Sequence, residues 1–460
     1  MHEQYDIRVS ALNQRKTGIT RSLAIPNPFS YVRLCEFLSQ HWDVNLKPYF
    51  QLKTETQFFC YSQIHLQKGN ADGALFHMNL PYEMKDSDLG TICQSLSINK
   101  RYKVTTDISR CFPSIYSHAI TWALVGKDVA KATKRDRKLW YNQLDDVNVN
   151  LKYGETDGQL IGPHSSNLLS EVVLTAVDKL MEDAGFEYVR HIDDCEYYAS
   201  TYEEAESFIH TFAKALKNFD LQINEKKTKI ESLPDRSEDW VTQMNCFYVG
   251  AEKTHSGQVV FAKARLMAFI DLSKRLVLET GNLAVYLYMM KMVADKYLGA
   301  KAKTLYINVV HDLLIKYPYL ASNIDVYFFE KFDVPVDRIQ LIAQNLYDDG
   351  IYRSNNEACS YALYWALKYN VTLDLPNLIS DADQSEDCVF RLLGYLNAKR
   401  CGDKVQINAF EEMAKKIVDV DRFWYFVYEV LPATDLPTSD MKTIKNAKVT
   451  FLRDEFIYHK

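Results

Sequence analysis

The sequence predicts an α+β domain followed by an all-α domain. Residues 101–250 alternate between β-rich runs and helix-period runs, whereas from about residue 263 the helix-period runs follow one another and strand signals become sparse. A chain of 460 residues is also too long for one compact core. We therefore predict an α+β domain over residues 1–260 and a helical domain over residues 261–460.

Local patterns predict the elements of the first domain. Residues 102–108 (YKVTTDI) alternate and are rich in strand formers, which predicts a strand that ends at Asp107. Two further strands are predicted over residues 186–192 and 195–199, with Asp193 and Asp194 in the turn between them. Helices are predicted after the prolines of residues 24–29 (AIPNPF) and over residues 115–124, 167–181 and 202–218.

The second domain is predicted to consist of helices only. The helix-period segments are residues 263–278, 283–296, 303–316, 336–348, 356–368, 387–398 and 408–418. Stacked helix pairs, as in a HEAT-type solenoid, are one arrangement that this pattern allows. The segments show no clean repeat period, so other helical arrangements stay open.

Charge argues against a tight clamp on nucleic acid. The net charge is −6, whereas a sequence-independent DNA-binding protein usually carries a basic footprint. Two basic runs stand out, residues 131–138 (KATKRDRK) and 226–229 (KKTK), but each is more often a solvated surface than a binding site.

The sequence predicts a cytoplasmic protein that does not enter a membrane. No run of 18 apolar residues is present, and the N-terminal residues lack the apolar core of a secretory signal. The nine cysteines are odd in number and form no CxxC pair, which predicts reduced thiols and no zinc ribbon.

Three carboxylates are the candidate catalytic groups. Asp107 closes a predicted strand, and Asp193 and Asp194 occupy a predicted hairpin turn. Side chains alternate along a strand, so both residues of the pair face Asp107 only if the turn twists. Carboxylates at neighbouring strand ends are suitable ligands for two Mg²⁺ ions about 3.5–4 Å apart, which would support an in-line displacement. An Asp-Asp pair also suits a hairpin turn without any catalytic role.

Five segments in order resemble the motifs of reverse transcriptases. They are residues 106–116 (TDISRCFPSIY), 158–171 (GQLIGPHSSNLLSE), 189–194 (VRHIDD), 221–230 (LQINEKKTKI) and 246–250 (CFYVG), which resemble motifs A to E. More narrowly, residues 24–38 (AIPNPFSYVRLCEFL) and the helical second half are similar to bacterial abortive-infection and defence-associated reverse transcriptases.

The resemblance implies a palm and fingers fold over the first domain and a role for particular residues. Asp107, Asp193 and Asp194, with the backbone carbonyl of Ile108, would bind two Mg²⁺ ions, for which Mn²⁺ is an alternative. Lys227 would act as a general acid toward pyrophosphate or as a charge stabiliser. The residues implied in nucleotide binding are Arg101, Lys103, Phe112 as a steric gate, Gly162 and His191.

Two positions depart from the family pattern. His191 stands where the family has Tyr, and Ile161 stands where many members keep Gln. Both changes lie where the family contacts the primer end or the nucleotide, so they put ordinary primer and nucleotide contacts in doubt. Phe112 has an alternative role as a buried packing residue.

The implied activity is that of an RNA-directed DNA polymerase acting on dNTPs in antiphage defence. Some members of the group make single-stranded DNA without a template and prime it from a protein residue. Copying of a dedicated non-coding RNA and a catalytically degenerate scaffold are the two alternatives. A homo-oligomer or a partner defence protein is compatible with each of them.

Overall fold

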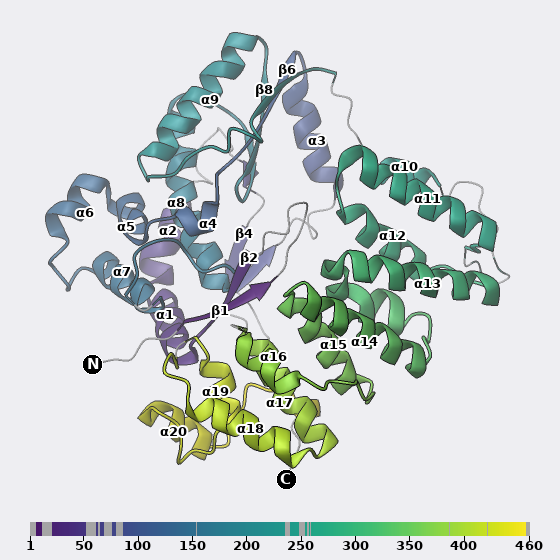
Figure 1. The fold of residues 1–460 in the computed structure, drawn as a ribbon. Helices are drawn as coiled ribbons and strands as arrows, with labels where there is room; N and C mark the ends of the chain where they lie inside the picture. The colour runs from purple at the N-terminus through teal and green to yellow at the C-terminus, as the bar shows by residue number, and fades with distance from the viewer. Residues whose placement is uncertain are drawn as a thin grey trace. The chain divides into compact units, whose positions relative to one another are not determined.

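The computed structural model describes most of the chain. The described residues are 6–11, 21–51, 61–62, 65–68, 76–79, 86–152, 154–234, 240–247, 254, 257, 259–385, 387–420 and 422–456. Two compact units are present, the first made of Met1–Asp6 and Ala24–Arg236 and the second of Ile7–Leu23 and Ser237–Lys460. The α+β character of the chain is confirmed (Figure 1). In the sequence the change of pattern lies near residue 260, whereas the compact units divide after Arg236.

A five-stranded sheet lies at the centre of the first unit. Its strand order is β3 (Tyr61–Ser62), β7 (Val189–His191), β8 (Asp194–Ala199), β6 (Tyr102–Asp107) and β9 (Lys229–Ser232). The pairing of β3 with β7 is parallel, and the other three pairings are antiparallel. Two smaller two-stranded sheets pair β1 (Asp6–Ala11) with β2 (Arg21–Pro26) and β4 (His65–Lys68) with β5 (Phe76–Asn79).

Helices surround this sheet. They are α1 (Pro28–Gln40), the π-helical turn Trp42–Leu46, α2 (Lys47–Gln51), α3 (Asp86–Ser97), α4 (Cys111–Ser114), α5 (Ser117–Val125), α6 (Lys127–Thr133), α7 (Trp140–Asn150), α8 (His164–Asp183) and α9 (Tyr202–Lys217). Figure 1 shows α9 and α3 on opposite sides of β6 and β8. The helix predicted over residues 115–124 is α5, which begins two residues later at Ser117 because Ile115 and Tyr116 have extended backbone between α4 and α5.

Helix α9 illustrates how the sequence sets a boundary and a buried face. The Thr201 hydroxyl accepts a hydrogen bond from the Glu204 N–H at 3.1 Å, and the Glu204 carboxylate accepts one from the Ser200 N–H at 2.8 Å. This arrangement satisfies amide groups that the first turn leaves unpaired. The apolar side of the helix packs on the sheet, where Phe208 stacks on Tyr197 of β8 with ring centroids 4.4 Å apart.

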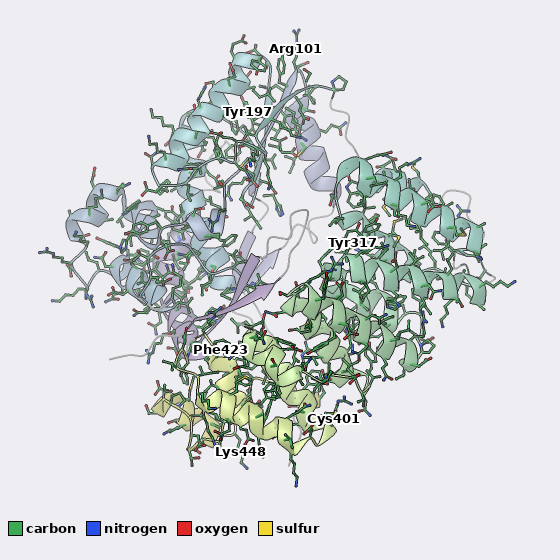
Figure 2. All side chains as sticks on the ribbon, in the orientation of Figure 1. Arg101, Tyr197, Tyr317, Cys401, Phe423 and Lys448 are labelled. Carbon is green, nitrogen blue, oxygen red and sulfur yellow. The ribbon has the colours of Figure 1, made fainter. Side chains whose placement is uncertain are left out.

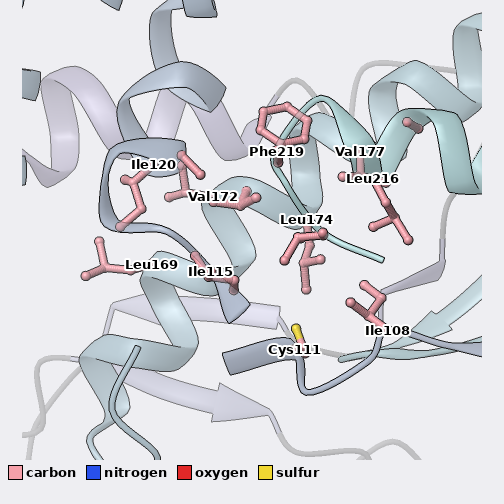
Figure 3. Close-up of a cluster of buried hydrophobic side chains, with 14 of the residues drawn as sticks. Ile108, Cys111, Ile115, Ile120, Leu169, Val172, Leu174, Val177, Leu216 and Phe219 are labelled. Atoms are coloured by element: carbon pink, nitrogen blue, oxygen red, sulfur yellow. The ribbon is translucent and has the colours of Figure 1, made fainter. Parts of the chain in front are cut away.

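The core of the first unit reaches the end of β6. Ile108, Cys111 and Ile115 follow Asp107 directly and are almost fully buried. Figure 3 shows them in one cluster with Leu169 and Val172 of α8. Burial of these side chains anchors the chain immediately after Asp107, because large core side chains each contribute about 1.5–3 kcal/mol.

The loop that precedes α8 is held at both ends. The Ala24 N–H of β2 donates to the Ile161 carbonyl at 2.8 Å, and the Gln159 N–H donates to the Phe112 carbonyl at 2.6 Å. Gly162 has φ 130°, and a Cβ atom on it would lie 2.8 Å from the Ala24 carbonyl oxygen. The close approach of β2 therefore explains the glycine at this position.

The second unit is helical from Lys263 onward. Its helices are α10 (Trp240–Cys246), α11 (Lys263–Thr280), α12 (Ala284–Ala294), α13 (Ala300–Lys316), α14 (Val336–Tyr352), α15 (Asn356–Lys368), α16 (Leu378–Gln384), α17 (Cys388–Cys401), α18 (Lys404–Lys415), α19 (Trp424–Val430) and α20 (Ser439–Asn446). Short 3-10 or π turns lie at Pro318–Asn323, Asp325–Phe329 and Asp454–Phe456. All seven predicted helical segments are present. Across the described ranges, no helix is both long enough and apolar enough to span a bilayer.

The close approach at Gly162 can be tested against a second glycine with positive φ. We expect Gly162→Ala to lower the stability of the first unit by more than Gly126→Ala, because Gly126 has φ 86° but no atom within 4 Å of the place that a Cβ would occupy. Each substitution carries the backbone penalty of about 1–3 kcal/mol, and only Gly162→Ala adds a contact with the carbonyl. Thermal unfolding of the two variants measures the difference, and equal losses would contradict this explanation.

Candidate active site

The register of the sheet brings the three carboxylates to one end of it. Asp107 at the end of β6 lies opposite Asp194, the first residue of β8. His191 also pairs with Asp194 across the hairpin, so the turn consists of Ile192 and Asp193. The predicted turn at Asp193 and Asp194 is therefore wrong by one residue.

The first hairpin strand is also shorter than predicted. Strand β7 begins at Val189 rather than at residue 186. The Phe186 ring packs edge-on against Tyr197 and Phe208, with centroids 5.5 and 5.6 Å apart, so aromatic packing replaces strand pairing there.

The hairpin turn has an unusual backbone. Ile192 has φ 55°, a left-handed conformation that is rare for a β-branched residue. The Ile192 carbonyl accepts a hydrogen bond from the Arg190 guanidinium at 2.8 Å, and the Asp193 carbonyl accepts one from the Ile108 N–H at 3.1 Å. The turn is thus tied to its own strand on one side and to the end of β6 on the other.

A second turn places Lys227 beside Asp107. The Asn224 N–H donates to the Asp107 carbonyl at 2.7 Å, and the Asn224 carbonyl accepts from the N–H groups of Lys227 and Thr228, both at 3.0 Å. The Thr228 hydroxyl lies 2.8 Å from the Thr106 hydroxyl. The Lys227 ammonium forms an ion pair with Oδ2 of Asp107. The predicted juxtaposition of Lys227 with the carboxylates is therefore present.

Asp193 lies in an environment that disfavours its negative charge. Burial raises the pKa of Asp193, and the nearby charges of Asp194 and Asp107 raise it further. Asp107 is buried, and its Oδ1 makes no hydrogen bond to any residue that the structure describes. Hydrogen bonding to Asp107 raises the pKa of Lys227, so its ammonium form is favoured. A cation is the species that would best offset these acids.

His191 has the properties of a neutral imidazole. Burial lowers its pKa, and this effect outweighs the opposing effect of Asp194. Its Nδ1 atom is buried and has no hydrogen-bond partner within the described part of the chain.

The donor atoms suit a hard divalent cation, although they do not form a closed ligand set here. Carboxylate oxygens are preferred ligands of Mg²⁺, and the unpartnered Oδ1 of Asp107 offers one of them. Among the residues that the structure describes, no three His, Cys, Asp or Glu side chains converge closely enough to hold a metal ion. Lys227 occupies the other oxygen of Asp107. The side chains therefore carry donor atoms suitable for Mg²⁺, but in this structure they do not point toward a common ion position.

The remaining predicted nucleotide-binding residues lie at different distances from the carboxylates. Phe112 is half-buried in α4, five residues after Asp107, and packs against the core. Lys103 lies four residues before Asp107 on β6, about 13 Å away by strand rise, and pairs with Glu196 at 3.2 Å. Arg101 is exposed beyond the start of β6, about 20 Å from Asp107 by the same rise, near the tip of the strands in Figure 2. Neither basic residue is brought to the carboxylate end of the sheet.

A buried charged cluster lies directly behind the hairpin and was not predicted. Arg190 is fully buried and pairs with Glu171 at 2.9 Å and with Asp178 at 2.6 Å, both on α8. The Tyr188 hydroxyl donates to Asp178 at 2.5 Å. The one sequence signal for it is that two acids seven residues apart interrupt the apolar side of α8.

Of the motif E segment, Cys246 and Phe247 are described, whereas residues 248–250 lie outside the described residues. No model of a known protein family matches this chain, and no curated protein matches it either.

The raised pKa of Asp193 predicts a stability that depends on pH. Because the pKa of Asp193 is higher in the folded state than in the unfolded state, ionisation of Asp193 lowers the free energy of unfolding. This loss of stability is absent below the unfolded pKa of about 4. It grows as the pH rises from there through the folded-state pKa. We expect Asp193→Asn to raise the Tm of the metal-free protein at neutral pH, and the gain to disappear toward acid pH. Thermal unfolding in EDTA at several pH values measures it.

Asp157 provides the control because its side chain is exposed. Asp157→Asn should leave the Tm unchanged over the same pH range. A lower Tm for Asp193→Asn at neutral pH would show that the ionised carboxylate is stabilised in the fold, contrary to this expectation.

Proposed function

We propose that the chain is a DNA polymerase of the reverse-transcriptase type. In this reaction a primer hydroxyl attacks the α-phosphate of a dNTP, a new phosphodiester bond forms, and the bond to pyrophosphate breaks. The observation that carries the proposal is the register of β6 and β8, which sets Asp107 opposite Asp194 beside the Asp193 turn, with Lys227 paired to Asp107. The order of the five sequence motifs supports the palm and fingers assignment of the first unit.

The three carboxylates and the Ile108 carbonyl are the proposed ligands of two Mg²⁺ ions, with Mn²⁺ as an alternative. Bound ions of this kind would offset charge on the attacking and leaving oxygens. The protein's contribution is to gather acids whose mutual repulsion is evident in the raised pKa of Asp193. Among the residues that the structure describes, Oδ1 of Asp107 has no hydrogen-bond partner, which supports the assignment because a buried acceptor without a partner costs about 1–3 kcal/mol.

Lys227 is the proposed cation for the leaving group. Lysine is protonated at neutral pH at its ordinary pKa, and hydrogen bonding to Asp107 raises that pKa further, so the ammonium can stabilise charge on pyrophosphate or serve as its general acid. Its side chain is more than half exposed, which leaves it free to move from Asp107 toward a bound triphosphate.

Phe112, Gly162 and His191 are the proposed contacts of the nucleotide and primer. Phe112 is half-buried on α4, near enough in sequence to Asp107 to serve as a gate against a ribose 2′-hydroxyl. His191 lies beside Asp194 and presents a neutral ring to the primer end. Arg101 and Lys103 lie too far along β6 to support the same role.

We propose that the second unit is a HEAT-like stack that holds single-stranded DNA product and acts in antiphage defence. The packing of α14 on α15, α15 on α17 and α17 on α19 supports a stack in which helices contact their near neighbours in sequence. Such a unit would also suit a homo-oligomer or a partner protein.

A catalytically inactive scaffold is the second candidate function. It is favoured by the ion pair of Lys227 with Asp107 and by the lack of a closed metal-ligand set among the described residues. In that case the Asp107–Lys227 pair would be a structural link between β6 and the turn at Asn224.

DNA synthesis by the purified protein tests the choice. We expect incorporation of labelled dNTPs that requires Mg²⁺ or Mn²⁺ and is abolished by Asp193→Ala/Asp194→Ala, because these residues are the proposed ligands. Asp157→Asn, an exposed carboxylate outside the proposed ligand set, is the matched control and should retain synthesis. Absence of synthesis in every condition, with wild type and double variant alike, would favour the scaffold.

Treatment with RNase separates two forms of the activity. Product that resists RNase and stays attached to the protein would support untemplated, protein-primed synthesis. Product that is lost after RNase treatment would identify a dedicated RNA template. Loss of phage protection in cells that carry Asp193→Ala/Asp194→Ala would connect synthesis to defence.

The Lys227→Met substitution distinguishes a catalytic Lys227 from a lysine that only forms a structural ion pair with Asp107. Removal of the ammonium frees Oδ2 of Asp107, so we expect Mn²⁺ affinity to rise about two- to fivefold, the scale of a partly exposed ion pair. Turnover should instead fall about a hundredfold or more if Lys227 donates the proton. Titration by electron paramagnetic resonance measures binding, with Lys226→Met on the exposed neighbour as the control. Weaker Mn²⁺ binding in Lys227→Met would contradict the expectation.

A further inference from the structure

The guanidinium of the fully buried Arg190 makes hydrogen bonds to several neighbouring groups. Its Nε donates to Asp178 at 2.9 Å, and Nη2 donates to Asp178 at 2.6 Å and to Glu171 at 2.9 Å. Its Nη1 donates to Glu171 at 3.2 Å and to the Ile192 carbonyl at 2.8 Å. These bonds use all five N–H donors of a guanidinium.

Four of the five bonds fix the plane of the guanidinium, and the fifth reaches the hairpin turn. Glu171 and Asp178 lie two turns apart on α8, and both are buried with Arg190. Two carboxylates surround one cation, so the arrangement leaves excess negative charge in the core. Buried clusters of this kind are often no more stable than apolar side chains of similar volume, so stability alone explains this one poorly.

The hydrogen bond from Arg190 to the Ile192 carbonyl lies at a residue whose backbone conformation is intrinsically unfavourable. A positive φ is unfavourable for a non-glycine residue, and isoleucine, with φ 55° here, is among the residues that adopt this conformation least readily. A hydrogen bond from a charged donor is among the stronger hydrogen bonds in proteins and can offset that penalty. The next residue along the chain is Asp193, whose carbonyl is held by Ile108.

We propose that Arg190 is a positioning residue that holds the Ile192 turn in its strained conformation, and thereby sets the directions of Asp193 and Asp194 toward Asp107. Helix α8 is the rigid support, and the guanidinium transmits its position to the turn. The part of this proposal that concerns metal ligands rests on the proposed function. The part that concerns the turn conformation does not.

Arg190→Lys tests the proposal because lysine keeps the charge but cannot donate to both acids and the Ile192 carbonyl in one plane. We expect a 10- to 100-fold loss of Mn²⁺ affinity, about the effect of losing a group that orients metal ligands. Faster hydrogen exchange at the Ile108 amide, which is bonded to Asp193, should accompany it. Glu171→Gln is the milder variant should Arg190→Lys fail to fold, and it should show the same two changes to a smaller degree.

The Ile192→Gly substitution distinguishes a positioning role of Arg190 from a role in stability alone. Glycine adopts positive φ without penalty, so the turn no longer needs the bond from Arg190. We expect Arg190→Lys/Ile192→Gly to recover most of the Mn²⁺ affinity and of the Ile108 protection while its Tm stays well below that of the wild type, because the buried acids still lack the guanidinium. Asp178→Asn is the comparison variant: it removes a buried charge but keeps the Nη1 bonds of Arg190 to Glu171 and to the Ile192 carbonyl, so its Tm should fall with a smaller loss of Mn²⁺ affinity than in Arg190→Lys.

The outcomes are distinguishable from a failure of the proposed function. If the wild-type protein binds no Mn²⁺, the metal assignment fails, and exchange at Ile108 still reports on the turn. The proposal is overturned, and Arg190 is only a structural residue, by either of two results. One is that Mn²⁺ affinity and Ile108 exchange change in proportion to Tm to the same degree in Arg190→Lys and Asp178→Asn. The other is that adding Ile192→Gly to Arg190→Lys restores neither Mn²⁺ affinity nor Ile108 protection.

Discussion

The antiparallel register of β6 and β8 is the constraint on which the candidate site depends. A shift of one residue would turn every side chain of one strand to the other face, so the pairing of Asp107 with Asp194 requires that register. The register is secured by packing within one core cluster. Phe208 of α9 stacks on Tyr197 of β8, and buried residues from Ile108 onward anchor the chain as it leaves β6. The site is thus a consequence of core packing a few residues away.

Around this constraint, local charge and backbone strain are concentrated in a small region. Burial and the charges of Asp194 and Asp107 raise the pKa of Asp193, Lys227 offsets part of the charge, and Ile192 adopts a backbone conformation that isoleucine seldom has. Strain and unfavourable charge at the same place are typical of sites that bind a ligand, because the surrounding fold must stabilise them. The buried cluster of Arg190 with Glu171 and Asp178 lies directly behind this region and is hydrogen-bonded to the Ile192 carbonyl.

Periodicity was sufficient to predict much of the fold. The strand that ends at Asp107, the long helix α8 and the helices of the second unit follow from apolar spacing, because each buries one continuous face. The position of the hairpin turn was missed, since turn propensities favour Asp193 and Asp194 over a β-branched Ile192. That preference was overridden by tertiary bonds from Arg190 and Ile108, which join distant segments and leave no periodic signal.

Anomalous X-ray scattering from Mn²⁺ would examine the site itself. In crystals of the protein grown with Mn²⁺ and a non-hydrolysable dNTP, we expect anomalous density bonded to Asp107 and to the Asp193–Asp194 hairpin. The Lys227 ammonium should then have left Oδ2 of Asp107 for the triphosphate. An intact Asp107–Lys227 pair, with no anomalous density at the hairpin, would contradict a metal-dependent polymerase and would favour a scaffold.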